Sequence, residues 1–342
     1  MMKKQRISGN FIKNGFKGSM EFSNGVITGF LINDNEQSEK IIIPTLNNQH
    51  IHLGEGFELP HNMSLLDYIK FSEREHSKPT YNREQIIRQT LQSCIETGTT
   101  KINTLGVHKA ITDFPLIAQC GYQVMQNDRL CGLTSLGVQG FDTFYKYCID
   151  HNIEPGVFLH SFYTNNAESI KFVQKILDKY NCFLAVHVAE DKESENIVKQ
   201  KWNGQNSMTL LKKFNLLGEK TTLVHCGLLS EDEFAFVAEK KSKITICPIS
   251  NRTLNTRYAN PLQMINAGVS WTISSDGMAS GKTANLLEQA AVVKNDFPQI
   301  QDQQLLSAIT NGHELNVGDD ASFLIINKKH IQSVYIKGDK VL

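Results

Sequence analysis

His50 and His52 stand two positions apart at the end of an apolar run, Ile41-Ile42-Ile43-Pro44-Thr45-Leu46. On a strand, residues i and i+2 point the same way. If residues 41–52 form one strand, both imidazoles leave the same side of it near its end, close enough to share a cation. An isolated His-x-His pair is more often two partly exposed histidines at a strand–loop junction, so the metal hypothesis depends on what the rest of the chain adds.

Further histidines and acidic residues follow other apolar runs in the same way. Taken singly, each such histidine is more often a hydrogen-bonded structural residue, and Asp276-Gly277 is more often a turn. Together they form a combination that chance rarely produces. Because Glu190 lies three residues after His187, out of step with a strand, the chain must turn between them, which would aim Glu190 at a substrate. The runs with their polar ends are Phe158-Leu159-His160, Val186-His187-Val188-Ala189-Glu190, Val224-His225-Cys226 and Ser274-Ser275-Asp276.

These runs belong to a regular alternation of strand and helix patterns. Eight strands that alternate with helices predict a parallel sheet closed into a (β/α)8 TIM barrel, an α/β fold. In such a barrel the strand ends carry the chemistry, and the long unassigned segment 54–81 is expected to be a loop that covers the substrate. The β-prone runs are 41–46, 99–103, 121–125, 156–159, 183–186, 221–224, 244–246 and 269–273, and the helical patterns are 84–97, 167–179, 208–214, 231–239 and 261–267.

Both ends of the chain have a different pattern, with short β-prone runs separated by turn residues such as Asn24-Gly25 and Gly338-Asp339. Such runs are typical of hairpins. We therefore expect residues 1–43 and 315–342 to form one small composite β-sandwich, and residues 44–314 to form the barrel.

Composition limits the classes of protein that this chain can be. Of its 342 residues 40% are hydrophobic and 20% charged, and the formal net charge is zero, so nothing points to a nucleic acid or an acidic membrane surface as a partner. The seven cysteines are scattered without a Cys-x-x-Cys pair. This is typical of reduced cytoplasmic proteins, and it excludes zinc ribbons and the cysteine-ligated zinc deaminase signature. Without an apolar region after the basic start, or any run of ~18 apolar residues, we expect a cytoplasmic protein with no export signal or membrane span.

One combination of these residues resembles that of the amidohydrolase superfamily, and specifically its nucleoside- and heterocycle-deaminase branch. The resemblance covers nearly the whole chain, and the motifs are more specific for the family than for a substrate. In chain order the combination is His50-x-His52, His187-x-x-Glu190, His225 and Asp276, and further family-like segments are Leu159-His160-Ser161-Phe162-Tyr163-Thr164, Cys247-Pro248-Ile249-Ser250-Asn251 and Ser275-Asp276-Gly277-Met278-Ala279-Ser280.

The resemblance implies a metal centre. Three imidazole nitrogens and one carboxylate oxygen suit Zn²⁺ best, with Fe²⁺ or Mn²⁺ as alternatives. Two-metal members of the superfamily usually carry a bridging lysine at the end of the fourth strand, where this chain has Phe158-Leu159-His160, so one divalent ion is expected. The ligands that the resemblance implies are His50, His52, His187 and Asp276.

The resemblance also implies roles in catalysis and in substrate binding. Glu190 would protonate a ring nitrogen and act as proton shuttle. His225 and Asp276 would orient or deprotonate a metal-bound water, whose pKa the cation lowers to ~7, and the resulting hydroxide would attack. The expected substrate contacts are His160, Tyr163, Glu190, Asn251 and Arg252.

The implied function is hydrolytic deamination of an amino-substituted nitrogen heterocycle, with adenine-type nucleosides or related purines as the leading substrate class and ammonia as a product. S-adenosylhomocysteine, methylthioadenosine and aminofutalosine-type nucleosides are candidates. A hydrolase of the same fold that acts on a C–Cl or cyclic amide bond is an alternative, although a proton donor at Glu190 favours the deaminase. The intact set of ligands argues against a third reading, a catalytically silent barrel that only binds. Family resemblance further implies a homodimer or a larger assembly.

Overall fold

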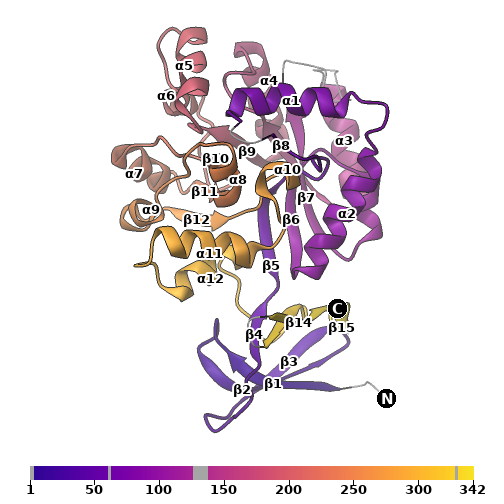
Figure 1. Ribbon diagram of the computed structural model, residues 1–342. Helices are drawn as coiled ribbons and strands as arrows, with labels where there is room; N and C mark the ends of the chain where they lie inside the picture. The colour runs from indigo at the N-terminus through magenta and orange to yellow at the C-terminus, as the bar shows by residue number, and fades with distance from the viewer. Residues whose placement is uncertain (1–3, 61–62, 126–137, 328–329) are drawn as a thin grey trace.

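Eight parallel strands form the barrel, which makes up the larger part of the molecule (Figure 1). They are β5 (Leu46–Ile51), β6 (Thr99–Leu105), β7 (Ile117–Val124), β8 (Glu154–Leu159), β9 (Phe183–Val188), β10 (Thr221–His225), β11 (Lys243–Ile246) and β12 (Ser270–Ile273). The computed structural model describes residues 4–60, 63–125, 138–327 and 330–342. The strands are hydrogen-bonded in chain order, and each pair of neighbours is parallel. Next to the seam between β12 and β5, the amide of Asp276 donates to the carbonyl of His50 at 3.1 Å. The predicted (β/α)8 barrel is confirmed.

Helices connect the strands and cover the outside of the barrel (Figure 1). They are α1 (Leu65–His76), α2 (Arg83–Glu96), the 3-10 helix η1 (Lys109–Asp113), α3 (Val138–Asp150), α4 (Ala167–Tyr180), α5 (Lys192–Lys201), α6 (Ser207–Lys213), α7 (Glu231–Glu239), α8 (Pro248–Thr253), α9 (Pro261–Ala267), α10 (Met278–Gly281), α11 (Leu286–Asp296) and α12 (Asp302–Thr310). Caps explain several boundaries: Ser230 begins α7 with a capping box that includes Glu233, and Asn181 ends α4 in the left-handed conformation. In the described part of the chain, no helix has the length and apolar character needed to cross a membrane.

Helix α1 lies in the segment 54–81, which the sequence pattern predicts as a loop. Ser64 caps its first turn by accepting a hydrogen bond from the amide of Asp67. On its inner face, Leu65 and Tyr68 are buried in a cluster with Leu254 and Ala279. Of the three buried residues of α1 one is the polar Ser72, so the apolar stripe of the helix is short. The loop prediction is therefore wrong for residues 65–76, and the helix lies across the end of the barrel at which the strands finish (Figure 1).

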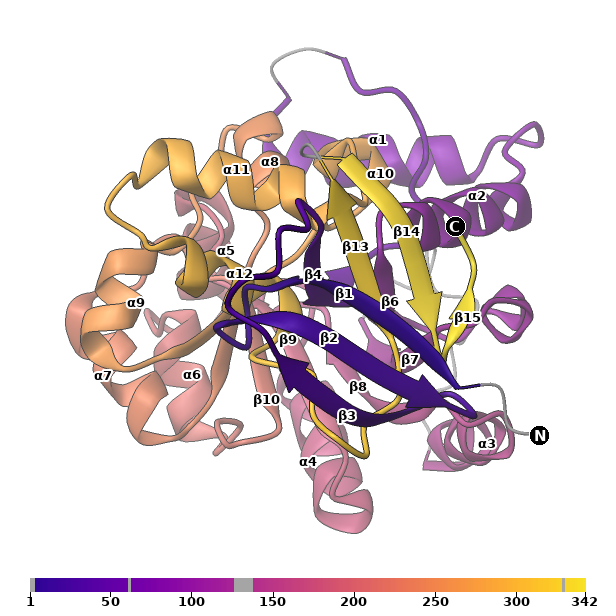
Figure 2. The same cartoon turned by 90° about the horizontal axis from the view of Figure 1, so that it is seen from below.

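The two ends of the chain pair in a separate small domain (Figure 2). Its strands are β1 (Gln5–Phe11), β2 (Phe16–Ser23), β3 (Val26–Ile32), β4 (Ile41–Pro44), β13 (Phe323–Asn327), β14 (His330–Ile336) and β15 (Asp339–Lys340). They are hydrogen-bonded in the order β15-β14-β13-β4-β1-β2-β3, as one mixed sheet. In it β4 is antiparallel to β13 and parallel to β1, so the N-terminal and C-terminal segments share one structure, as expected.

The run from Ile41 to His52 is not one strand. It divides into β4, which belongs to the terminal sheet, and β5, which belongs to the barrel. Pro44 has no amide hydrogen to continue a ladder, and the amide of Leu46 already bonds to the carbonyl of Gly98 beside β6. Since alternate residues face opposite sides, Ile42 packs into the core of the terminal sheet and Ile43 into the core of the barrel. The prediction of a single strand is wrong, and the break connects the two domains.

Phe323 is expected to hold the terminal sheet together. Its side chain is fully buried and stacks on Tyr335 with ring centroids 4.6 Å apart. Phe323→Ala should lower the free energy of unfolding by about 3–5 kcal/mol, because it removes this burial and leaves a cavity. Urea denaturation followed by circular dichroism measures the effect. Val317→Ala is the control, since Val317 is 61% exposed and should change stability by less than about 0.5 kcal/mol. Equal shifts in both variants would contradict the prediction.

Candidate metal centre

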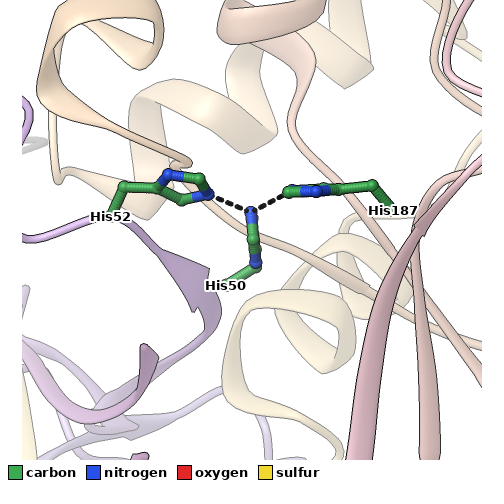
Figure 3. A group of neighbouring side chains, drawn as sticks. All are labelled: His50, His52 and His187. Carbon is green, nitrogen blue, oxygen red and sulfur yellow. Dashed lines mark hydrogen bonds between the residues drawn. The ribbon is translucent and has the colours of Figure 1, made fainter. Parts of the chain in front are cut away.

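Three histidines converge at the carboxyl end of the barrel (Figure 3). His50 lies near the end of β5, His52 follows that strand, and His187 lies in β9. The Nε2 atom of His50 is 3.0 Å from Nε2 of His52 and 3.3 Å from Nε2 of His187. Three ring nitrogens therefore face one small volume.

Asp276, which follows β12, adds a carboxylate to the same place. Its Oδ1 lies 3.4 Å from Nε2 of His50 and 3.3 Å from Nε2 of His52. Its Oδ2 accepts a hydrogen bond from the hydroxyl of Ser250 at 2.6 Å. Oδ1 is thus the oxygen that faces the histidines. We refer to His50, His52, His187 and Asp276 as the four-residue cluster.

The electrostatics of the cluster favour a positive charge. Burial lowers the pKa of His50 to about 4 and takes the pKa of His187 well below its usual value, so both rings are neutral and keep a lone pair for a metal. Burial alone would raise the pKa of Asp276, but His52 and His50 outweigh it and hold that pKa well below its usual value. Burial alone would lower the pKa of His52, but Glu55 and Asp276 raise it to about 9.

This donor set fits a divalent metal ion. Two overlapping groups of three residues place their ligand atoms within 4.8 Å of one another. One group is His50, His52 and His187, and the other is His50, Asp276 and His225, which lies beside the cluster. Neutral imidazole nitrogens with one carboxylate oxygen are ligands that Zn²⁺ and Fe²⁺ accept.

Unusual backbone conformations at the strand ends aim side chains into the site. Ala189, His225 and Asp276 all have left-handed backbones, with φ of 49°, 71° and 64°. Non-glycine residues adopt this conformation at a cost of about 1–3 kcal/mol and often do so at functional sites. The turn at Ala189 is the one that the spacing of His187 and Glu190 requires, and it directs both side chains into one cavity.

This cavity has a volume of about 60 Å³ and lies beneath α1. Glu190 lines it and is only 6% exposed, and burial raises the pKa of its carboxyl to about 7. Its Oε1 lies 3.4 Å from Nε2 of His225. A carboxyl with such a pKa can hold and release a proton near neutral pH, as general acid–base chemistry requires. The other lining residues include His160, Tyr163 and, from α1, Leu65, Tyr68, Ile69 and Ser72.

Hydrogen-bond partners at Nδ1 fix the orientation of two histidines that line the cavity. Nδ1 of His187 donates to the carbonyl of His160 at 3.0 Å, which leaves Nε2 for the cluster. Nδ1 of His225 lies 3.2 Å from Oδ1 of Asn251, which leaves Nε2 for Glu190. Such partners determine which ring nitrogen carries the proton.

Not every residue expected to contact substrate lies in this cavity. His160 and Tyr163 line it, but Asn251 is buried behind His225 and also bonds to Thr256. Arg252 pairs with Asp296 and lines a neighbouring cavity to which Glu190 also contributes. Three residues around the cluster were not predicted as site residues: Glu55, Tyr68 and Ser250, although Ser250 lies in a family-like segment. The His52-x-x-Glu55 spacing was a signal for Glu55, whereas Tyr68 depends on a helix that was not predicted.

Most of the chain matches a known protein family. The model of the amidohydrolase family matches residues 41–341, which is well over half of the chain. The chain belongs to the amidohydrolase family. The match includes every residue of the cluster as well as Glu190 and His225, so the site of this amidohydrolase lies within the matched region.

Curated relatives of this amidohydrolase include nucleoside deaminases. The 5-methylthioadenosine/S-adenosylhomocysteine deaminase of Pyrococcus furiosus is 26% identical over 271 residues, which cover 74% of this chain and 63% of the relative. The 5'-deoxyadenosine deaminase of Methanocaldococcus jannaschii is 26% identical over 270 residues, with the same coverage of 74% and 63%. This amidohydrolase therefore spans somewhat less than two thirds of the length of these relatives.

Solved structures show that the fold extends over the whole chain. The guanine deaminase from C. acetobutylicum with bound guanine has a TM-score of 0.82 at 18% identity, covering 99% of this chain and 100% of that one. The Helicobacter pylori aminofutalosine deaminase in complex with methylthio-coformycin has a TM-score of 0.73 at 14% identity, covering 95% of both chains. At such identities the likeness supports the fold of this amidohydrolase alone.

Proposed function

We propose that this chain catalyses metal-dependent hydrolytic deamination of an amino-substituted nitrogen heterocycle, with adenine-type nucleosides as the substrate class. The observation that carries the proposal is a buried proton-carrying carboxyl, Glu190, in one cavity with a cluster of metal-ligand type. The names of the curated relatives, methylthioadenosine, S-adenosylhomocysteine and 5'-deoxyadenosine deaminases, support the substrate class.

The four-residue cluster would hold one divalent ion, most simply Zn²⁺. When bound, such an ion lowers the pKa of a water molecule from 15.7 to about 7 and so supplies a nucleophile at neutral pH. The chain contributes the ligands and the charge balance, because Asp276 is an anion beside the neutral imidazoles of His50 and His187. Ser250 keeps one carboxylate oxygen of Asp276 turned toward the histidines.

The side chains around the cluster would move the protons. Glu190 in its acid form donates a proton to a ring nitrogen next to the amine-bearing carbon, which makes that carbon more electrophilic. His225 and Asp276 orient the attacking water and accept a proton from it. The C–N bond to the amine breaks as a proton reaches the amine nitrogen, and ammonia leaves. Of the two protons of the water molecule, one ends on ammonia and the other restores the acid form of Glu190, so the enzyme returns to its starting protonation state.

A second cavity supports a nucleoside as substrate rather than a free base. It has a volume of about 440 Å³ and shares His52, Glu55, Ser72 and His160 with the small cavity at the cluster. The reacting ring would lie at the cluster, and the rest of the molecule would extend into the larger cavity. Arg83, His108 and Gln123, which line the larger cavity but not the small one, supply hydrogen-bond donors suited to hydroxyl or other oxygen-rich groups.

Ammonia release from a substrate panel tests the proposal. The protein is stripped with a chelator, reconstituted with Zn²⁺, and assayed with 5'-deoxyadenosine, methylthioadenosine, S-adenosylhomocysteine, adenine and guanine. We expect turnover of at least one adenine nucleoside by the zinc form and a loss of about 100-fold or more in the stripped form. A fully metallated protein that releases no ammonia but hydrolyses a chlorotriazine or a cyclic amide would replace the deaminase with the alternative hydrolase. A protein that takes up no metal would support a binding module.

A further inference from the structure

Glu55 lies in the turn after β5 and connects a member of the cluster to helix α1. Its Oε1 lies 2.8 Å from Nδ1 of His52, whose opposite ring nitrogen faces the cluster. Its Oε2 accepts a hydrogen bond from the hydroxyl of Tyr68 in α1. The side chains of His52 and Glu55 are only 15% and 16% exposed, and Tyr68 is 8% exposed. A chain of two hydrogen bonds therefore runs from α1 to the ring of His52.

The position of Glu55 is determined on its other sides by the turn that carries Asp276. The carbonyl of Glu55 accepts a hydrogen bond from the amide of Ala279 at 3.0 Å. Gly277 packs directly against the carboxylate, because a Cβ atom at that position would lie 2.3 Å from Oε2 of Glu55. The loops after β5 and β12 thus fit together at the seam of the barrel, with the carboxylate of Glu55 between them.

We propose that Glu55 is a positioning residue for the metal centre. We further propose that the hydrogen bond from Tyr68 to Glu55 makes the orientation of His52 depend on how α1 packs over the barrel. A carboxylate at Nδ1 keeps the proton on that nitrogen, orients the ring, and leaves the lone pair of Nε2 for the cation. The inference rests on the proposed metal centre. It goes beyond the proposed function because it assigns residues outside the cluster to metal retention and ties retention to the helix that covers the site.

The structure offers a matched control for the tyrosine. The hydroxyl of Tyr81 also bonds to the loop after β5, but it donates to the backbone carbonyl of Gly54 and accepts from the amide of Gly56, whereas the hydroxyl of Tyr68 bonds to the carboxylate of Glu55. Tyr81→Phe therefore removes two hydrogen bonds from the same loop without touching the link between α1 and His52. A general loosening of the loop would affect Tyr68→Phe and Tyr81→Phe alike, whereas the proposed link predicts an effect for Tyr68→Phe alone.

Zinc affinity of the full-length protein tests the inference. Wild type and the variants Glu55→Gln, Glu55→Ala, Tyr68→Phe and Tyr81→Phe are stripped of metal, and zinc binding is measured by competition with a chromophoric chelator. Thermal melts of the stripped proteins show that each variant is folded. We expect the Kd to rise about 10–100-fold for both Glu55 variants, as for other outer partners of metal ligands. Tyr68→Phe should give a smaller rise and faster zinc release, and Tyr81→Phe should match wild type.

Two outcomes would overturn the inference. One is a folded Glu55→Gln variant that binds zinc as tightly as wild type. The other is an equal loss of affinity in Tyr68→Phe and Tyr81→Phe, which would reduce Tyr68 to a structural support of the loop. If wild type itself binds no zinc, the metal centre fails and the inference fails with it. Tight zinc binding by wild type and both Glu55 variants would leave the proposed function intact and reject the inference alone.

Discussion

Glu190→Gln is expected to lower turnover by about 100-fold or more while leaving the metal in place. Gln has nearly the same shape as Glu but cannot give up or take a proton. Glu190 is not a member of the four-residue cluster, and its Oε1 lies 3.4 Å from Nε2 of His225. Its pKa of about 7, raised by burial, indicates that its carboxyl can exchange protons near neutral pH. Losing that proton should slow the chemical step and change metal binding little.

The measurement for Glu190 combines steady-state kinetics with metal analysis of the same protein samples. Glu193→Gln is the matched control, because Glu193 lies in the same segment but is exposed at the start of α5. This control should keep wild-type kcat and metal content. Wild-type turnover in Glu190→Gln would remove Glu190 from the mechanism. Loss of metal together with activity would instead give Glu190 a part in holding the cation.

Asp276→Ala is expected to empty the metal centre. Asp276 is the one anion in the four-residue cluster, and its Oδ1 lies within 3.4 Å of both His50 and His52. Without it, three imidazoles would have to bind a doubly charged ion with no anionic ligand, and the hydroxyl of Ser250 would lose its acceptor. We expect the metal content to fall from about one ion per chain to a small fraction of that, with a loss of activity of more than about 100-fold.

Metal analysis by mass spectrometry, on protein purified without chelator or added metal, checks the second prediction. Asp142→Ala is the control, because Asp142 pairs with Lys179 on the outside of the barrel. It should retain the wild-type metal content. A variant Asp276→Ala that keeps its full metal content would show that the cluster does not bind the ion as proposed, even if activity were lost.

The barrel was predictable because its signals are local. Helices such as α7 and α9 begin and end where caps and apolar spacing place them, and β-prone runs such as Phe183–Val188 are short and apolar. Local signals failed where one continuous apolar run contributed a strand to each of the two sheets. The run from Ile41 to His52 looks like a single strand, but its first half pairs with strands from both ends of the chain and its second half begins the barrel.

The candidate site was likewise predictable only in part. The sequence by itself determined that His50, His187 and Asp276 would lie at one end of the barrel, because parallel barrel strands bring all their carboxyl ends to one rim. The family resemblance then selected these residues, with His52, as the expected ligands. Only the tertiary structure decided what surrounds them, because those contacts join segments that are far apart in the chain. Across such contacts α1 covers the cavity, Ser250 orients Asp276, Asn251 lies behind His225, and the carboxylate of Glu55 lies between His52 and Tyr68.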